Sequence, residues 1–380
     1  MADSAYKVLG PNDKVTTRTL LHEAIPITGT IVSGTYGTFP NEDNIKNFSH
    51  GMFQSVYDYP YLSSSANHIF DIAIGVSAQS GIYSSVTVQK EKKRNIYNQM
   101  AQVLVGYDVT GSVLQFDGDG DFTSTGDKMN DCIFLVFSRL LIKDEIKKES
   151  FNLELGVEVN RDSAIGSTRM TVMDVSASNE YRVNSPAGEY GILYATGAID
   201  SAVTTETIGS HEYVKCGLIY YQAGVVVLTS SLFIEHDVTN GLLATNAASG
   251  MDGVEWLKKT SNQSQDNDII DAFKANEISA SADSFRNRIY NLQFNNTTEL
   301  NSTVYFCRAN HNEFNYSSNP TYLSESKVRV KNQSTDVPVS YITTIGMYND
   351  RRELLAVAKL SEPLKKTPDT EFTLRVRLDY

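Results

Sequence analysis

The stretch from Tyr341 to Tyr380 constrains the fold more than any other part of this chain. Two β-rich runs, Tyr341 to Tyr348 and Leu354 to Leu360, flank a short connection that begins with Asn349 and Asp350. Asparagine and aspartate favour tight turns because their side chains bond to the backbone close by. The pattern therefore predicts a β-hairpin.

A closing strand is expected after the hairpin. Pro363 and Pro368 interrupt the sequence first, and proline is excluded from central strands because it has no backbone N–H. Further on, apolar and polar side chains alternate, which predicts a strand with one buried face and one solvated face. The apolar members of this run are Phe372, Leu374, Val376 and Leu378.

The same hairpin resembles a module of known proteins. The runs TIGMYND (Thr344 to Asp350) and LLAVAKL (Leu354 to Leu360), followed by Pro363 and Lys365, resemble a module in tail, tail-fibre and baseplate proteins of tailed bacteriophages. In those proteins a similar hairpin is followed by a proline and a closing strand.

Two further segments are similar, more loosely, to virion structural proteins of large contractile-tailed phages. They are NEFNYSSNPTYL (Asn312 to Leu323) and DKVTTRTLLHEAIPITG (Asp13 to Gly29). The resemblance implies a structural protein of the virion, located in the phage tail and assembled in the host bacterial cytoplasm. Its implied partners are other virion structural proteins, in a homo-oligomer or another symmetric assembly, and it supplies no pattern of catalytic residues.

Length and charge limit the class of protein. A chain of 380 residues can bury a sizeable core and is long enough for two or three domains of about 100 to 200 residues each. The formal net charge of −12 argues against a large nucleic-acid surface, because binding to phosphates requires clustered lysines and arginines. We therefore expect no nucleic-acid partner.

Cysteine usage and apolar patterning indicate a soluble chain that folds in a reducing compartment. Cys132, Cys216 and Cys307 are widely separated, which predicts buried thiols rather than disulfides or a zinc site. The N-terminal residues lack the pattern of a cleaved secretory signal, and no run approaches the ~20 apolar residues of a membrane span. We expect no membrane partner.

Residues 1–60 predict an extended N-terminal arm. Ile25 to Ile31 alternates as a short strand would, and the neighbouring residues are rich in glycine and polar side chains. Such an arm buries little surface alone, so it typically lies across a neighbouring subunit. Tyr57, Tyr59 and Tyr61 surround a proline and predict either a packed turn or an interface anchor.

Residues 61–130 predict a mixed helical region. Apolar residues recur at helical spacing between Ile69 and Val76, and more clearly between Ile96 and Leu104. Gly106 follows the second run, as expected just past the end of a helix.

The loop DGDGD is the one candidate for metal chemistry, through Asp117, Asp119 and Asp121. Alternating carboxylates begin the EF-hand loop because calcium binds several converging oxygens. The rest of that pattern is missing, since Phe122 stands where glycine is required and Lys128 stands where a bidentate glutamate is required. An acidic turn between two strands is therefore expected, with calcium binding as the alternative and with no cofactor.

Residues 131–310 predict a β-rich domain. Cys132 to Phe137 is apolar throughout, as in a buried strand. Tyr213 to Tyr221 and Val225 to Phe233 predict a hairpin of two long apolar strands around a short turn.

A third hairpin is expected from Ile289 to Phe294 and from Thr303 to Cys307, around the turn-like stretch Asn295 to Asn301. Successive hairpins without βαβ alternation favour antiparallel β-sandwich domains. Together with a few helices in the N-terminal third and the extended arm, this gives a mainly β (α+β) fold class. Residues 311–380 complete it as a C-terminal β-hairpin module.

Enzyme signatures are missing from the sequence. It has no phosphate-binding loop, no G-x-G-x-x-G, no G-x-S-x-G, no H-E-x-x-H and no C-x-x-C. Glu235, His236 and Asp237 come nearest to a catalytic group, but adjacent residues on a strand point to opposite faces and do not converge. We therefore expect no catalytic residues and no enzymatic activity.

The functional hypothesis is a structural component of a phage tail, in the baseplate or its periphery, that acts through protein–protein interfaces. A neck, collar or head-decoration protein is the first alternative. A carbohydrate-binding or carbohydrate-cleaving tail protein is the second, and the single tryptophan weighs against it. The candidate interface residues are Tyr57, Tyr59, Tyr61, Tyr348, Leu354 and Tyr380.

Overall fold

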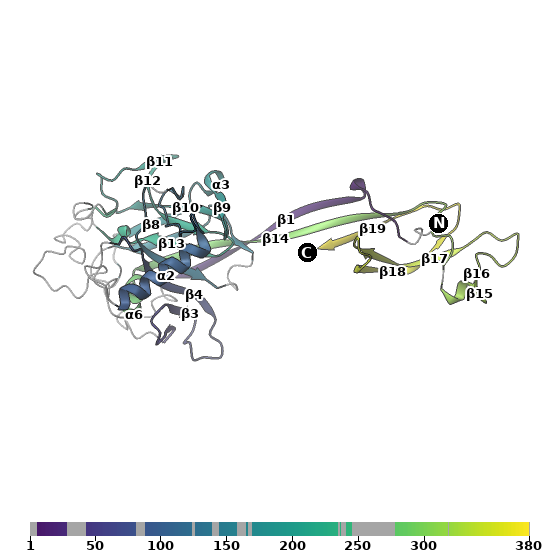
Figure 1. Ribbon diagram of the computed structural model, residues 1–380, viewed down its shortest axis with the longest axis horizontal. Helices are drawn as coiled ribbons and strands as arrows, with labels where there is room; N and C mark the ends of the chain where they lie inside the picture. The colour runs from purple at the N-terminus through teal and green to yellow at the C-terminus, as the bar shows by residue number, and fades with distance from the viewer. Residues whose placement is uncertain are drawn as a thin grey trace, which may run out of the picture. The chain divides into compact units, whose positions relative to one another are not determined.

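The computed structural model describes most of the chain (Figure 1). The described residues are 6–28, 43–80, 88–123, 126–138, 144–157, 165, 169–234, 236, 241–244, 278–317 and 319–379. The chain divides into two compact units: unit 1 comprises Met1–Leu20 and Glu299–Tyr380, and unit 2 comprises Leu21–Thr298. The division falls within β1 (Lys14–Thr28) and β14 (Ile289–Ala309), so each of these strands contributes to both units.

Unit 2 is built around one sheet. In spatial order its strands are β14, β7 (Asn152–Gly156), β8 (Arg169–Met173), β10 (Gly188–Gly197), β12 (His211–Tyr220), β13 (Val225–Thr229), β5 (Asp131–Phe137), β4 (His68–Val76), β3 (Gln54–Tyr57) and β2 (Ile45–Asn47). Three short strands join it: β6 (Glu145–Ile146) pairs with β14, β9 (Arg182–Ser185) with β10 and β11 (Glu206–Ile208) with β12. All of these neighbouring strands pair antiparallel. The mainly β, antiparallel fold class predicted from the sequence is confirmed.

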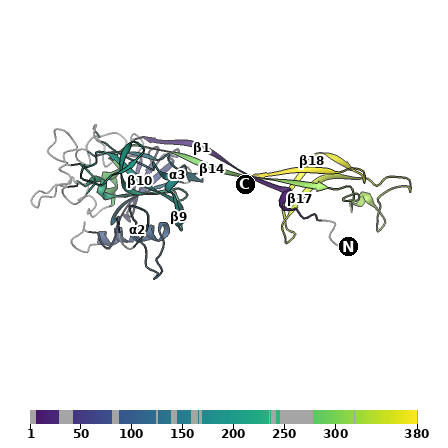
Figure 2. The same cartoon turned by 90° about the horizontal axis from the view of Figure 1, so that it is seen from above.

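The described helices of unit 2 are α2 (Val88–Leu104), α3 (Ala177–Glu180) and α6 (Ile278–Arg286), together with the short 3-10 helix η2 (Ser230–Phe233). The sequence predicted a helix ending at Leu104, and α2 confirms it. Gly106 follows with a φ of 96°, a left-handed conformation that glycine adopts without strain. In Figure 2, α2 lies below the strands of unit 2.

Both faces of the central strands are buried. Alternate side chains of β5 and β13 enter two separate cores, the first shared with α6 and the second with α2. Leu135 pairs with Val226, and both lie in the first core; Phe134 pairs with Val227, and both lie in the second. The register therefore places matching apolar residues on the same face of neighbouring strands, which keeps each core continuous.

The segment from Ile69 to Val76 is a strand, β4, and the prediction of a helix there was wrong. β4 lies between β3 and β5, where it is covered on both faces, and most of its side chains are buried. A strand buried on both faces is apolar almost throughout, so its sequence lacks the alternation that distinguishes strands from helices.

The expected hairpin between Ile289 and Cys307 is instead one continuous strand, β14. The stretch from Asn295 to Asn301, predicted as a turn, stays extended because it is paired: Asn296 pairs with Ile146 of β6. Pairing within the sheet overrides the turn preference of asparagine here. The hairpin predicted around Gly224 is confirmed by β12 and β13, whose pairs run from Tyr220 opposite Val225 to Gly217 opposite Leu228. The second strand ends at Thr229, and the residues up to Phe233, predicted to continue it, form η2 instead.

The described part of unit 1 contains three groups of paired strands, the smallest of them formed by the two-residue strands β15 (Leu323–Ser324) and β16 (Lys327–Val328). β14 pairs with β19 (Phe372–Asp379), from Ser302 opposite Asp379 to Ala309 opposite Phe372, and β1 flanks β14. β17 (Ser340–Tyr348) and β18 (Leu354–Lys366) form a separate two-stranded sheet, here called the ribbon. The described 3-10 helices of unit 1 are η1 (Pro11–Asp13) and η3 (Pro320–Tyr322).

The ribbon and β19 confirm the hairpin and the closing strand predicted at the C-terminus. β19 pairs with β14, and β18 continues through Pro363, which a two-stranded sheet tolerates because its strands are edges. The N-terminal arm, predicted as extended, contains β1, which lies beside β14 of the same chain. In unit 1 the Thr16 and Thr303 hydroxyls are 3.1 Å apart.

Gly75 of β4 allows α2 to approach the sheet closely. A Cβ at this position would lie 2.7 Å from Cε2 of Phe134 and 2.9 Å from the backbone nitrogen of Tyr97. We expect Gly75→Ala to lower the free energy of unfolding by about 1–3 kcal/mol, because a close-packed core accommodates an added methyl only by strain. Gly10→Ala is the matched control, since its Cβ would meet only Asp13 at 3.5 Å. Chemical denaturation measures both, and equal stability of the two variants would contradict the packing described.

Candidate functional site

The ribbon exposes large apolar side chains. Opposite residues run from Tyr348 and Leu354 near the turn to Ser340 and Lys366 at the base. The exposed apolar residues of the ribbon are Tyr341, Tyr348, Leu354, Leu355 and Val357. Large exposed apolar side chains gathered on one small sheet make the ribbon the candidate interaction surface.

The turn of the ribbon is held by Asn349. Its Oδ1 accepts hydrogen bonds from the backbone N–H groups of Arg351 (2.9 Å) and Glu353 (2.8 Å), as the sequence signal at this position predicts. Arg352 has a φ of 64°, and its guanidinium lies 5.4 Å from the ring centre of Tyr6. The Tyr6 ring in turn packs edge-on against Tyr348, with ring centres 5.1 Å apart.

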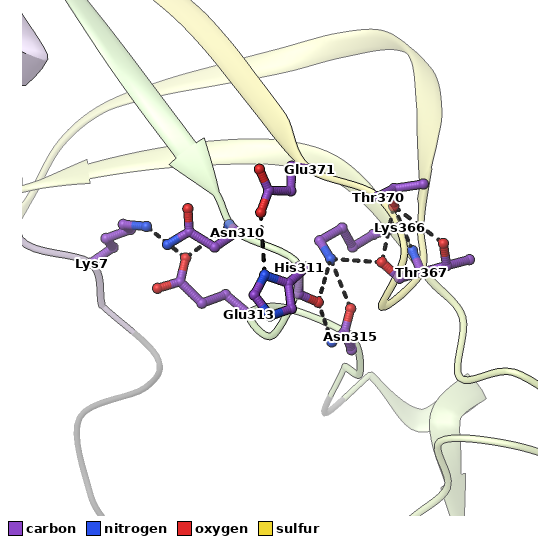
Figure 3. Close-up of polar contacts among 9 residues, drawn as sticks. All are labelled: Lys7, Asn310, His311, Glu313, Asn315, Lys366, Thr367, Thr370 and Glu371. Carbon is purple, nitrogen blue, oxygen red and sulfur yellow. Dashed lines mark hydrogen bonds and ion pairs between the residues drawn. The ribbon is translucent and has the colours of Figure 1, made fainter.

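The base of the ribbon is fixed by a buried ammonium group (Figure 3). Lys366 is 0% exposed, and its Nζ donates to the carbonyl oxygens of His311 (3.1 Å) and Thr367 (2.8 Å) and to Oδ1 of Asn315 (2.9 Å). Desolvation lowers the pKa of Lys366. Three neutral oxygens therefore satisfy the three donors of this lysine.

The strand opposite is anchored on the same loop. Ser340, which pairs with Lys366, donates its hydroxyl hydrogen to the carbonyl oxygen of Phe314. Nδ2 of Asn315 also donates to the carbonyl oxygen of His311 at 2.9 Å. Both strands of the ribbon thus start from one hydrogen-bonded loop, residues 310–315.

Exposed ion pairs surround this base. Nζ of Lys7 lies 2.6 Å from Oε2 of Glu313, which also accepts a hydrogen bond from the backbone N–H of Asn310 at 3.0 Å. Nδ1 of His311 lies 3.2 Å from Oε1 of Glu371. Such exposed pairs contribute about 0–1 kcal/mol each. Lys366 differs from them in being enclosed, so its three hydrogen bonds fix where the end of β18 lies.

Charge differs sharply between the units. Unit 1 contains 14 lysines and arginines and 12 aspartates and glutamates, whereas unit 2 contains 19 and 33. The chain's negative charge therefore belongs to unit 2, and unit 1 has a net charge of +2. Near-neutral surfaces associate with less electrostatic repulsion than strongly charged ones.

The structure brings the three predicted metal ligands together. Asp117, Asp119 and Asp121 each place one carboxylate oxygen within 4.8 Å of the others, in a group that runs from buried to exposed. Oδ1 of Asp119 accepts from the N–H of Asp121 (3.0 Å), and Oδ1 of Asp121 accepts from the N–H of Thr123 (2.8 Å). These bonds are those of a self-capped acidic turn.

A lysine pairs with one carboxylate of this loop. Lys128, opposite Asp117 across an isolated β-bridge, forms an ion pair with the buried Asp117 carboxylate. Burial raises the pKa of Asp117, and the hydrogen bond from Lys128 opposes that rise. Phe122, where a calcium loop needs glycine, stacks on Tyr190 with ring centres 5.1 Å apart. This geometry supports the acidic-turn interpretation.

The other predicted residues are dispersed. Tyr57 and Tyr61 have ring centres 6.4 Å apart, and Tyr59 and Tyr61 are exposed, so the cluster combines a packed turn with accessible rings. Tyr348 and Leu354 are exposed neighbours in the ribbon, whereas Tyr380 lies outside the described residues.

The predicted histidine and cysteine features form no reactive group among the described residues. Nδ1 of His236 lies 3.1 Å from the carbonyl oxygen of Gly241, while residues 235 and 237 lie outside the described part of the chain. The cysteines are free thiols: Cys132 and Cys216 are buried, and Cys307 is half-buried rather than buried as predicted. Desolvation raises the pKa of Cys216 well above its ordinary range.

A pocket of about 640 Å³ lies in unit 2, beside the acidic loop. Asp127 and Glu206 line it, and Nζ of Lys215 lies 3.3 Å from Oε2 of Glu206. Among the described residues that line it, the one aromatic side chain is that of Tyr213, which is largely buried. The pocket thus offers acids and hydroxyls but no exposed aromatic face among its described lining residues.

The chain matches no protein-family model, and no curated protein or solved structure matches it. Among the described helices, none combines the length and apolar character needed to cross a bilayer. The ribbon was predictable from the sequence, but the enclosure of Lys366 was not, because two of its oxygen partners, on His311 and Asn315, lie more than fifty residues away in the chain.

Calcium is expected to leave the melting temperature of the chain unchanged, because the Lys128 ammonium already neutralises Asp117. Thermal unfolding in millimolar calcium and in a chelator measures this. A calcium-dependent rise that Asp119→Asn removes, and that the control Asp108→Asn outside the loop retains, would contradict the expectation.

The buried carboxyl of Asp174 is expected to make stability depend on pH. It accepts hydrogen bonds from the N–H groups of Glu149 (2.8 Å) and Phe151 (3.0 Å) and from the Tyr221 hydroxyl (3.1 Å), yet burial raises its pKa from 3.8 to about 7. The folded state therefore holds this proton more tightly than the unfolded chain does. The resulting stabilisation is complete below pH 3.8 and is lost as the pH rises through about 7.

Chemical denaturation at about pH 5 and about pH 8 tests this, since the native group titrates between those values. We expect the wild type to lose more stability over this interval than Asp174→Asn does. Asp58→Asn is the control: at Asp58 desolvation is outweighed by hydrogen bonds from Asn67, which lower the pKa below this interval. Equal losses in the wild type and Asp174→Asn would refute the assignment.

Proposed function

We propose that this chain is a structural component of a bacteriophage tail, in the baseplate or its periphery, and that it acts through the ribbon of unit 1. The observation that carries the proposal is the exposure of large apolar side chains on a two-stranded sheet. Leu355 is 67% exposed and Val357 is 51% exposed. Burying such side chains against a partner yields about 25 cal/mol per Å² of apolar surface.

The base of the ribbon supports this role. A binding surface is more effective when it is ordered before the partner arrives, because less conformational entropy is then lost on binding. Hydrogen bonds from Ser340 and Lys366 connect both strands to the loop at residues 310–315, so the base of the ribbon is ordered before a partner binds.

The assignment to a phage tail rests on sequence resemblance. The residues that resemble phage tail and baseplate modules, Thr344 to Asp350 and Leu354 to Leu360, are those that build the ribbon and its turn. A neck, collar or head-decoration protein would use the same surface, so the position within the virion is the part that experiment must decide.

A carbohydrate-binding or carbohydrate-cleaving protein has weaker support. The unit 2 pocket holds Asp127 and Glu206, but sugar recognition commonly uses an exposed aromatic ring, and Tyr213 is only 8% exposed. Glu206 is also paired with Lys215. A protein–protein interface therefore explains the exposed apolar side chains of the ribbon, which sugar binding in the unit 2 pocket does not.

Cryo-electron microscopy of virions that carry the wild-type chain should show it in the tail-end assembly. Leu355→Lys with Val357→Lys is expected to lower the copy number per particle about tenfold or more, because a charge buried at an interface is costly. Quantitative mass spectrometry of purified virions measures the copy number.

Val103→Lys with Val109→Lys is the matched control, since both valines are exposed on unit 2 and the added charge is the same. Density in the neck or on the head would favour the first alternative. Absence of the wild-type chain from virions would overturn the proposal and direct attention to assays of glycan cleavage.

A further inference from the structure

The free edge of β17 carries none of the features that prevent strands from pairing with other chains. β17 contains no charged residue and no proline over its nine positions, SYITTIGMY. It pairs with β18 on one side, and the sheet that the two form has no third strand among the described residues. An edge of this kind presents unpaired N–H and C=O groups to any compatible strand.

The opposite edge of the ribbon is protected. β18 contains Lys359, Glu362, Pro363 and Lys365. Its register also shifts: Ile342 pairs with Leu364 and Thr344 pairs with Lys359, so the intervening residues of β18 bulge. Charges, a proline and a bulge are the devices by which sheet edges avoid pairing, and all three lie on the same strand.

We propose that β17 pairs antiparallel with β17 of a second copy of this chain, which joins two ribbons into a four-stranded sheet in the order β18–β17–β17–β18. The proposal deepens the interface role given to the ribbon and is independent of where the chain lies in a virion. A two-fold axis through the contact brings the same uncharged edge from both copies, so the N–H and C=O groups that point outward from one β17 face complementary groups of the other.

Charge and stability favour a second copy as the occupant. Unit 1 has a net charge of only +2, and β17 contributes none of it, so two such edges meet without repulsion. A two-stranded sheet alone is marginally stable in water, and three or more strands give independent stability. Pairing also sets Tyr341 and Tyr348, both exposed in one chain, beside the neighbouring strand.

Sedimentation equilibrium of the purified full-length chain tests the proposal. The expected wild-type species has twice the mass of the 42.1 kDa chain. Thr343→Lys with Thr344→Lys should raise the dissociation constant about tenfold or more, because four like charges then meet across the contact. Both threonines are exposed in the single chain, so the fold of each copy is preserved.

Ser361→Lys with Glu362→Gln is the matched control, since it adds the same charge to exposed positions of β18 and should leave the dissociation constant unchanged. Hydrogen exchange supplies a second measurement that needs no variant: backbone amides of β17 should gain protection as the wild-type concentration rises. A monomeric wild type, a dimer that the two double variants weaken equally, or concentration-independent exchange in β17 would each overturn the inference. A monomer that is still incorporated into virions would leave the proposed function standing.

Discussion

Burial on both faces is the constraint on which unit 2 depends. Its central strands are covered on both faces, so α2 and α6 must pack closely against the sheet. The polar side chains that they bury there must have hydrogen-bond partners. The contact of α6 with β3 shows how this is achieved: Nη2 of Arg286 lies 3.1 Å from Oδ1 of Asp283, and Nε2 of Gln54 donates to the same oxygen at 2.5 Å. Nε of Arg286 also donates to Oε1 of Gln54 at 3.3 Å. Because these side chains satisfy one another's hydrogen-bonding groups, buried charges can lie beside an apolar core.

Unit 1 follows a different principle. Few of its side chains are buried, and its order comes from paired strands and from polar anchors at their ends. β19 and the base of the ribbon are each held by backbone pairing together with one or two enclosed side chains, such as Val376 and Lys366. In a unit built this way, large apolar side chains of the ribbon stay exposed, whereas most apolar side chains of the central strands of unit 2 lie in its two cores.

The success of sequence reasoning depended on whether the signal was local. The ribbon was predictable because its turn is held by hydrogen bonds that Asn349 accepts from residues no more than four positions away in the chain. Helix α2 was predictable because its apolar residues recur at helical spacing and end near Gly106. β4 was wrongly predicted as a helix, because a strand that is buried on both faces lacks the alternation of apolar and polar residues that identifies a strand. The Lys366 anchor could not be predicted, since a lysine at the end of a strand normally remains in water and its partners come from a distant loop.

Enclosure of Lys366 also has a consequence for its chemical reactivity. Amines react with acylating reagents only when they are accessible and unprotonated, and Lys366 is 0% exposed although desolvation lowers its pKa. The adjacent Lys365 is exposed on the same strand. The rate at which Lys365 is acylated therefore serves as a reference for an accessible lysine. The rate at which Lys366 is acylated, relative to that reference, reports how often the base of the ribbon opens.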